Sequence, residues 1–143
     1  MRKIILLPLL FAALIFSLSS CSLTRPKIED FEWKMKTIVH IEENSVVYDA
    51  VEEESPLHPY AKIIDMTLIA NNGKITITDA TNNKIYEGNY TVSGKNPKGT
   101  DYDITISGKP AHATVAMTTY RDGTKEPTLP ITFEEYSIYF YKK

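Results

Sequence analysis

Apolar and polar residues alternate with a period of two over most of the chain from residue 31 onward. Successive side chains of a β-strand point to opposite faces, so this alternation predicts strands with one buried face and one solvated face. The first such stretch runs from residue 31 to residue 40, and one of its faces is expected to hold Phe31, Trp33, Met35, Thr37 and Val39. Residues 31–143 show no sustained apolar stripe at helical spacing. This part of the chain is therefore predicted to be β-structure.

Turn signals divide residues 31–143 into about eight predicted strands. Asn72-Gly73 is the strongest signal, because both residues tolerate the positive φ of a tight hairpin turn. The predicted strands are residues 31–40, 46–51, 61–70, 74–79, 84–93, 101–107, 111–120 and 133–141, with residues 94–99 as a loop. Short connections favour an antiparallel meander, and closure into a barrel would remove its exposed edges. We expect an all-β, antiparallel meander barrel of about eight strands, with a β-sandwich as the alternative because periodicity cannot show closure.

The first 20 residues have the organisation of an export signal. Arg2 and Lys3 precede an apolar run from Ile4 to Phe16, and four small or apolar residues then lead to Cys21. This apolar run is shorter than the roughly 20 residues that a membrane-spanning helix needs. The predicted organisation is a signal peptide over residues 1–20, a tether over residues 21–30 and one domain over residues 31–143.

The segment Leu18-Ser19-Ser20-Cys21 resembles the lipobox of bacterial lipoproteins. The resemblance implies that Cys21 becomes the first residue of the mature protein and carries acyl chains such as palmitate, which anchor it to a membrane outside the cytoplasm. Cys21 is the only cysteine, so it cannot form an internal disulfide. An ordinary secretory signal is the alternative. Because Ser22 rather than aspartate follows Cys21, an outer-membrane location is favoured in a cell with two membranes, and either face of that membrane, the one toward the periplasm included, stays open.

Charge and residue spacing argue against several functions. The signal segment holds two of the 16 basic residues and none of the 18 acidic ones, so the mature chain has a formal net charge of −4. A nucleic-acid partner is not expected, since such proteins cluster Lys and Arg. His40, His58 and His112 lack metal-ligand spacing, and no serine lies in a Gly-x-Ser-x-Gly elbow. We therefore expect no enzyme, no metal site and no cofactor.

Several short motifs resemble bacterial lipocalin-like domains, which are small meander barrels of the calycin type. They are Trp33 in the first strand, Met66-Thr67-Leu68 before Asn72-Gly73-Lys74, the segment Glu87-Gly88-Asn89-Tyr90, and a last strand of large apolar residues. The resemblance spans about residues 31–141. It implies a barrel with an apolar cavity for a small ligand.

Two classes of function remain open from the sequence. In the first, the protein is a lipid-anchored binding module for a small apolar ligand, with a candidate cavity wall of Trp33, Met35, Met66, Tyr90 and Phe140. In the second, the barrel is filled, and the protein is an envelope interaction, structural or inhibitor protein that presents loops such as residues 94–99 to a protein partner. The nine tyrosines and five phenylalanines fit either class, because they could line a cavity or form a packed core. An apolar void would favour the first class, and a solid interior would favour the second.

Replacement of Cys21 by alanine should abolish acylation. No thiol would remain to accept diacylglycerol, and the unprocessed precursor should accumulate. Metabolic labelling with radioactive palmitate measures this directly. Label on Cys21→Ala at the wild-type level would contradict the lipoprotein prediction.

Overall fold

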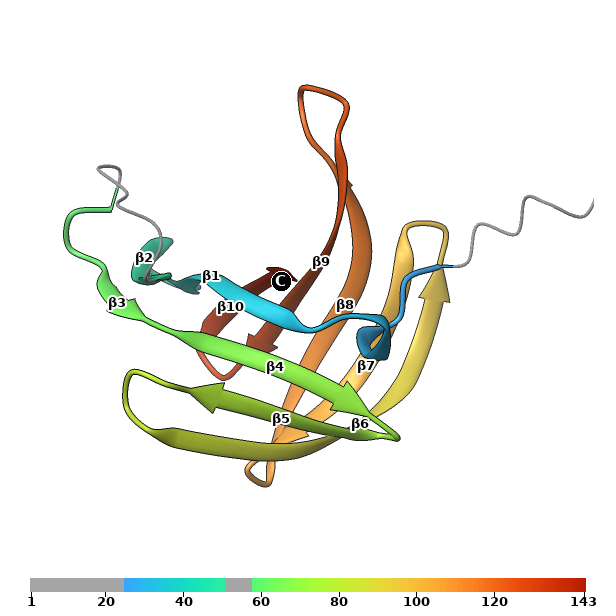
Figure 1. Cartoon of the computed structure of the whole chain (residues 1–143), viewed down its shortest axis with the longest axis horizontal. Coiled ribbons are helices and arrows are strands. Elements are labelled where there is room, and N and C mark those ends of the chain that lie inside the picture. Colours follow the sequence, from blue (N-terminus) through green and yellow to red (C-terminus); the bar gives the residue numbers. More distant parts are fainter. Residues whose placement is uncertain (1–24, 51–57) are drawn as a thin grey trace, which may run out of the picture.

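The computed structural model describes residues 25–50 and 58–143 (Figure 1). These residues form one short 3-10 helix and ten strands, which confirms the all-β prediction. In chain order the elements are η1 (Ile28–Asp30), β1 (Trp33–His40), β2 (Ser45–Ala50), β3 (Lys62–Ile64), β4 (Met66–Asn71), β5 (Lys74–Asp79), β6 (Lys84–Asn96), β7 (Gly99–Ile106), β8 (Lys109–Thr119), β9 (Lys125–Phe133) and β10 (Tyr136–Lys142). No helix within the described ranges could span a membrane.

Eight of the strands close into an antiparallel barrel. Strands β4 to β10 pair in chain order, each with the next. Strand β1 joins the two edges, because it pairs with β10 from Trp33 to His40 and with β4 at Trp33 and Lys34. The predicted meander barrel is therefore confirmed, and the sandwich alternative is wrong. Closure satisfies the backbone groups that an open sheet would leave at its edges.

Strands β2 and β3 widen one end of the barrel. Beyond Lys34, the edge of β1 that faces β4 pairs with β2 instead, from Thr37 to His40. Strand β2 in turn pairs in parallel with β3, which continues through Asp65 into β4. Two strands that are neighbours near Trp33 are thus separated by an inserted strand near His40. Because barrel diameter grows with strand number, the end near His40, here called the mouth, is the wider one.

The opposite end of the barrel, here called the closed end, is sealed by η1. Ile28 is completely buried, and its carbonyl oxygen accepts a hydrogen bond of 2.7 Å from the indole Nε1 of Trp33. The Ile28 amide donates to the hydroxyl oxygen of Tyr102 at 3.2 Å, and the Tyr90 hydroxyl donates to Glu29 at 2.6 Å. Trp33 has no exposed surface. It therefore belongs to the core, where it fixes the segment that enters the barrel.

The prediction of which residues of the first strand are buried is wrong for the second half of that strand. Trp33 and Met35 point into the core as predicted, but Ile38 is buried where Val39 was expected. The reason is a β-bulge between Met35 and Thr37, seen as a shift of register against β10. An extra residue in one strand reverses the alternation beyond it.

The expected loop over residues 94–99 is also wrong. Strand β6 continues to Asn96 and β7 begins at Gly99, so only Pro97 and Lys98 form the turn of a long two-stranded ribbon. Val92 is 55% exposed because the ribbon extends past the barrel wall. A second ribbon, formed by β8 and β9, extends from the same end of the barrel (Figure 1).

Strand β9 was not expected from the sequence. Pro127 and Pro130 interrupt its pattern, since proline cannot donate to a ladder. In the structure Pro130 pairs with Tyr139 of β10, and at this position β9 has no partner residue on β8. Pro127 pairs with Met117 of β8, and it lies beyond the end of the stretch of β9 that pairs with β10. Each proline therefore faces a partner strand on one side only. This placement allows a strand that contains two prolines.

Truncation of Trp33 should cost a large share of the folding free energy. Trp33→Ala would leave a cavity and an unpaired Ile28 carbonyl, so we expect a loss of about 3–5 kcal/mol, measured by urea unfolding with circular dichroism. Trp33 is the only tryptophan, so its emission in the wild type should be blue-shifted and poorly quenched by acrylamide. Strong quenching with a loss below about 1 kcal/mol would contradict the core placement.

Candidate ligand-binding site

An open cavity of about 430 Å³ occupies the mouth of the barrel. Its wall draws on most of the barrel strands and on the inserted strands β2 and β3. The lining residues are Ile38, Tyr48, Ile64, Met66, Ile77, Asp79, Asn82, Lys84, Tyr86, Ile106, Phe133 and Ile138. Most of them are large apolar or aromatic residues, so the cavity offers an apolar surface to a ligand.

The cavity ends where the barrel core becomes filled. Met35, Leu68 and Phe140 are completely buried. On its strand, each of them is the next inward-facing residue toward the closed end after a residue that lines the cavity. Below them lie Trp33 and the η1 plug. The interior is therefore filled toward the closed end and hollow at the mouth. At the mouth, the inserted strand β2 widens the wall and contributes Tyr48.

The charged and amide side chains of the wall all lie at the hairpin that joins β5 and β6. Asp79 is buried, and both of its carboxylate oxygens accept hydrogen bonds from Asn82, at 3.0 Å from the backbone amide and at 2.8 Å from the side-chain amide. Lys84 stands opposite Asp79 in the β5–β6 ladder. The aspartate thus fixes the turn, and one side of the mouth can contact a polar group of a ligand.

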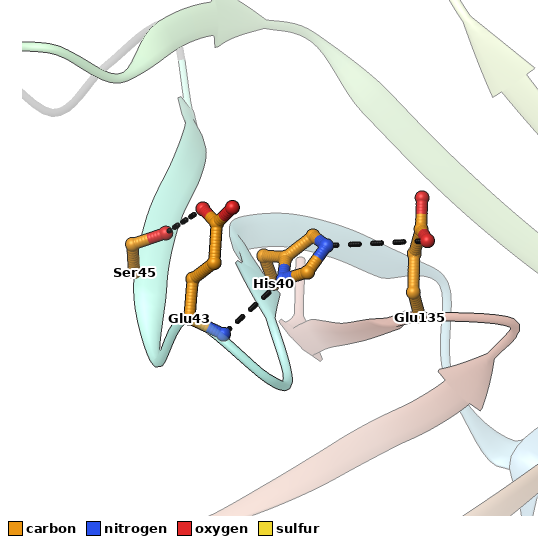
Figure 2. Close-up of polar contacts among 4 residues, drawn as sticks. All are labelled: His40, Glu43, Ser45 and Glu135. Atoms are coloured by element: carbon orange, nitrogen blue, oxygen red, sulfur yellow. Dashed lines mark hydrogen bonds and ion pairs between the residues drawn. The ribbon is translucent and has the colours of Figure 1, made fainter.

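The turn between β1 and β2 forms part of the rim (Figure 2). The Glu43 amide donates to Nδ1 of His40 at 3.3 Å, so the imidazole proton is on Nε2, which lies 4.0 Å from a carboxylate oxygen of Glu135. The His40 ring also meets the ring of Tyr136 edge-on, with centroids 5.4 Å apart. A hydrogen bond to the Glu135 carboxylate is the main cause that raises the pKa of Tyr136.

This rim network does not assemble an activated nucleophile. The Ser45 hydroxyl donates to the carboxylate of Glu43 at 3.3 Å and not to His40 (Figure 2). The acceptor nitrogen of His40 is already occupied by the Glu43 amide. A serine nucleophile needs a base at its own oxygen, so these contacts close the turn and serve the fold.

A buried carboxylate lies behind the cavity wall on β2. Asp49 is 1% exposed, and its Oδ2 lies 3.2 Å from Nδ1 of His58, whereas its Oδ1 has no hydrogen-bond partner within the described part of the chain. Asp49 and His58 join β2 to the segment that leads into β3. No group of three or more His, Cys, Asp or Glu in the described ranges could hold a metal ion.

The structure separates the five residues proposed for the cavity wall. Met66 lines the cavity at the mouth, whereas Trp33, Met35 and Phe140 are completely buried in the lower core. Tyr90 lines a different cleft, of about 570 Å³, between the β6–β7 ribbon and the segment before η1. Cys21 lies outside the described residues.

Sequence reasoning missed most of the lining residues. Ile38, Ile64 and Phe133 lie near strand ends at the mouth, and alternation predicts which face a residue takes but not its height along the barrel. The height follows from strand direction: residues late in β1 and early in β4 meet at the same end of an antiparallel barrel. Tyr48 could not be found this way, because it depends on the inserted strand.

Comparison of the chain with protein-family models, with curated proteins and with solved structures found no match. The fold alone does not determine function, which depends on the site and its surroundings.

The hydrogen bond between Tyr90 and Glu29 should make stability depend on pH in the alkaline range. Burial, followed by this hydrogen bond, raises the pKa of Tyr90 from 10.0 to about 12. A group whose pKa is raised on folding stabilises the fold below its unfolded pKa, and this contribution is lost as pH rises through its folded value. We expect Tyr90→Phe to be less stable than wild type below pH 10, with the difference narrowing between pH 10 and about 12.

Urea unfolding of both proteins across this range measures the effect. Groups that titrate equally in the two proteins cancel in the difference. A difference that stays constant from pH 9 to pH 12 would contradict the role of the Tyr90 hydroxyl.

Proposed function

We propose that this protein is a lipid-anchored lipoprotein of the bacterial cell envelope that binds a small apolar ligand in the mouth of its lipocalin-like barrel. The observation that carries the proposal is the cavity of about 430 Å³, whose wall consists mainly of isoleucine, methionine and aromatic side chains. Binding sites for small molecules are concave, mostly apolar and about 300–1,000 Å³ in volume. The mouth cavity fits each part of that description.

The wall also limits the chemistry of the ligand. An apolar body can contact Ile64, Met66 and Ile77, since burial of apolar surface contributes about 25 cal/mol per Å². A polar end group would lie beside Asn82 and Lys84, where it can keep hydrogen bonds to protein or water. We therefore propose an amphipathic ligand with a small polar end, and no chemical reaction on it.

The anchor places this site outside the cytoplasm. The proposed lipid-bearing Cys21 is four residues before Arg25, the first described residue, and four residues extend at most about 14 Å. Arg25 lies at the closed end of the barrel, beside η1. The mouth is at the other end of the barrel, so the anchor and the cavity do not interfere. An outer-membrane location in a cell with two membranes is part of the same proposal.

Binding can be tested with N-phenyl-1-naphthylamine, a neutral apolar fluorophore. We expect saturable enhancement of its emission by a chain that begins at Ser22, since every residue of the core cluster lies between Ile28 and Phe140. Ile64→Trp should reduce affinity for the probe at least about tenfold, because Ile64 is 6% exposed and points into the cavity. The matched control is Ile63→Trp, whose side chain lies on the opposite face of β3 and is 50% exposed.

The outcomes separate the two classes of function. Loss of binding in Ile64→Trp but not in Ile63→Trp, with equal thermal stability, supports a ligand site at the mouth. Equal affinities in both variants, or no saturable binding by the wild type, would contradict it. The filled lower core would then favour the alternative of an interaction or inhibitor protein without a ligand.

A further inference from the structure

Charged side chains are distributed unequally along the barrel axis. Within the described residues, the closed end and its two ribbons carry eleven basic and six acidic side chains. The basic ones are Arg25, Lys27, Lys34, Lys36, Lys74, Lys95, Lys98, Arg121, Lys125, Lys142 and Lys143, and the acidic ones are Glu29, Asp30, Glu32, Asp101, Asp122 and Glu126. The mouth end has the opposite balance, with Lys62, Lys84 and Lys109 against Glu42, Glu43, Asp65, Asp79, Glu134 and Glu135, while Asp49, Glu87 and Asp103 lie between the two ends.

Antiparallel pairing brings these basic residues together from distant parts of the sequence. The start of β1 pairs with the end of β10, so Lys34 lies opposite Tyr141 and beside Lys142. The turns after β4, β6 and β8 lie at this same end, because β4 leaves the mouth as β1 approaches it. Lys95 and Lys98 flank the tip of one ribbon, and Arg121 and Lys125 lie at the tip of the other.

Much of this positive charge is not neutralised within the protein. Lys143 forms an ion pair of 2.5 Å with Glu32. In contrast, Arg25, Lys27, Lys74, Lys95, Lys98, Arg121 and Lys125 are in no ion pair with another described residue. They are all exposed. Their charges are therefore available to an external anion.

The surface near the tether combines basic and apolar groups. The cleft of about 570 Å³ beside η1 is lined by Arg25, Lys27 and Lys95 together with Val92 and Tyr90. Val92 is 55% exposed and lines this cleft. A surface of this kind suits the boundary region of a bilayer, where phosphate groups lie next to acyl chains.

We propose that the closed end docks on a membrane surface that contains anionic phospholipids, with the two ribbon tips and the cleft beside η1 facing the headgroups. The proposal rests on the lipid anchor of the proposed function, because the four residues from Cys21 to Arg25 extend at most about 14 Å and so hold Arg25 and the closed end close to the bilayer. Each lysine near an anionic surface contributes about a fivefold change in the docking equilibrium. The acidic mouth then faces away from the membrane.

The test uses the acylated protein in vesicles. Its Cys21 sulfur is held in a thioether, so a fluorophore can be placed on one introduced thiol, either in Pro97→Cys at the ribbon tip or in Ile41→Cys at the mouth. The vesicles contain a phospholipid with a nitroxide on its headgroup, and they are either neutral phosphatidylcholine or about one-third phosphatidylglycerol. Contact with the headgroups quenches the fluorophore.

Docking predicts strong quenching at residue 97 and little at residue 41 in anionic vesicles. Quenching at residue 97 should fall in neutral vesicles, and also in about 1 M salt, where the Debye length is about 3 Å. The double variant Lys95→Gln/Lys98→Gln should shift the docking equilibrium roughly 25-fold. The matched control Lys62→Gln/Lys109→Gln removes two charges at the mouth and should leave quenching unchanged.

Failure of docking and failure of the anchor give different results. Protein that floats with neutral vesicles but shows no difference in quenching at residue 97 between neutral and anionic vesicles would overturn docking and leave the anchor intact. Protein that does not float with neutral vesicles would contradict the anchor, and its flotation with anionic vesicles alone would still support docking. Equal loss of quenching in the two double variants would overturn the assignment to the closed end.

Discussion

The pairing of β1 with two different partners is the constraint on which the rest of the structure depends. Along one edge β1 holds β10 over its whole length, and this closes the barrel. Along the other edge it begins on β4 and then changes to β2. The change of partner occurs where the strand bulges after Met35. A closed barrel of eight strands therefore gains an additional strand at one end only, and the hollow mouth is a consequence of that insertion.

The two ends of the barrel are stabilised by different means. At the closed end, the buried polar groups of η1 are satisfied by side chains that already belong to the core, such as Trp33 and Tyr102. At the mouth, hydrogen bonds within turns maintain the shape while the apolar wall remains partly open, as the paired contacts of Asp79 with Asn82 illustrate. Stability is thus concentrated away from the cavity. The open apolar wall at the mouth buries less surface and so contributes less free energy of folding. The filled core near the closed end provides most of that stabilisation.

The alternation of residues was sufficient to predict an all-β domain, and the short connections favoured a meander, but closure into a barrel became visible only in the pairing of β1 with β10 and β4. It could not predict the bulge in β1, since the bulge depends on pairing with both neighbours, and it could not predict β9, in which Pro127 and Pro130 hide the pattern. For the site, apolar and aromatic identity led to Met66, which lines the cavity, but also to Trp33 and Phe140, which fill the core. Composition does not distinguish these positions. Their difference is height along the barrel axis, which is set by strand direction and by the length of chain between turns.

Orientation links the proposed anchor to the proposed ligand site. If the closed end faces the bilayer, the filled core and the η1 plug lie between the membrane and the cavity, so a ligand cannot pass directly from that bilayer through the barrel interior. It must reach the cavity from the side of the acidic rim, where Glu43 and Glu135 flank His40. Carboxylates at that rim repel anionic molecules and favour neutral or cationic ones. The arrangement therefore suits uptake from the aqueous phase or from a partner protein, with selection by charge at the rim before selection by shape and polarity inside the mouth.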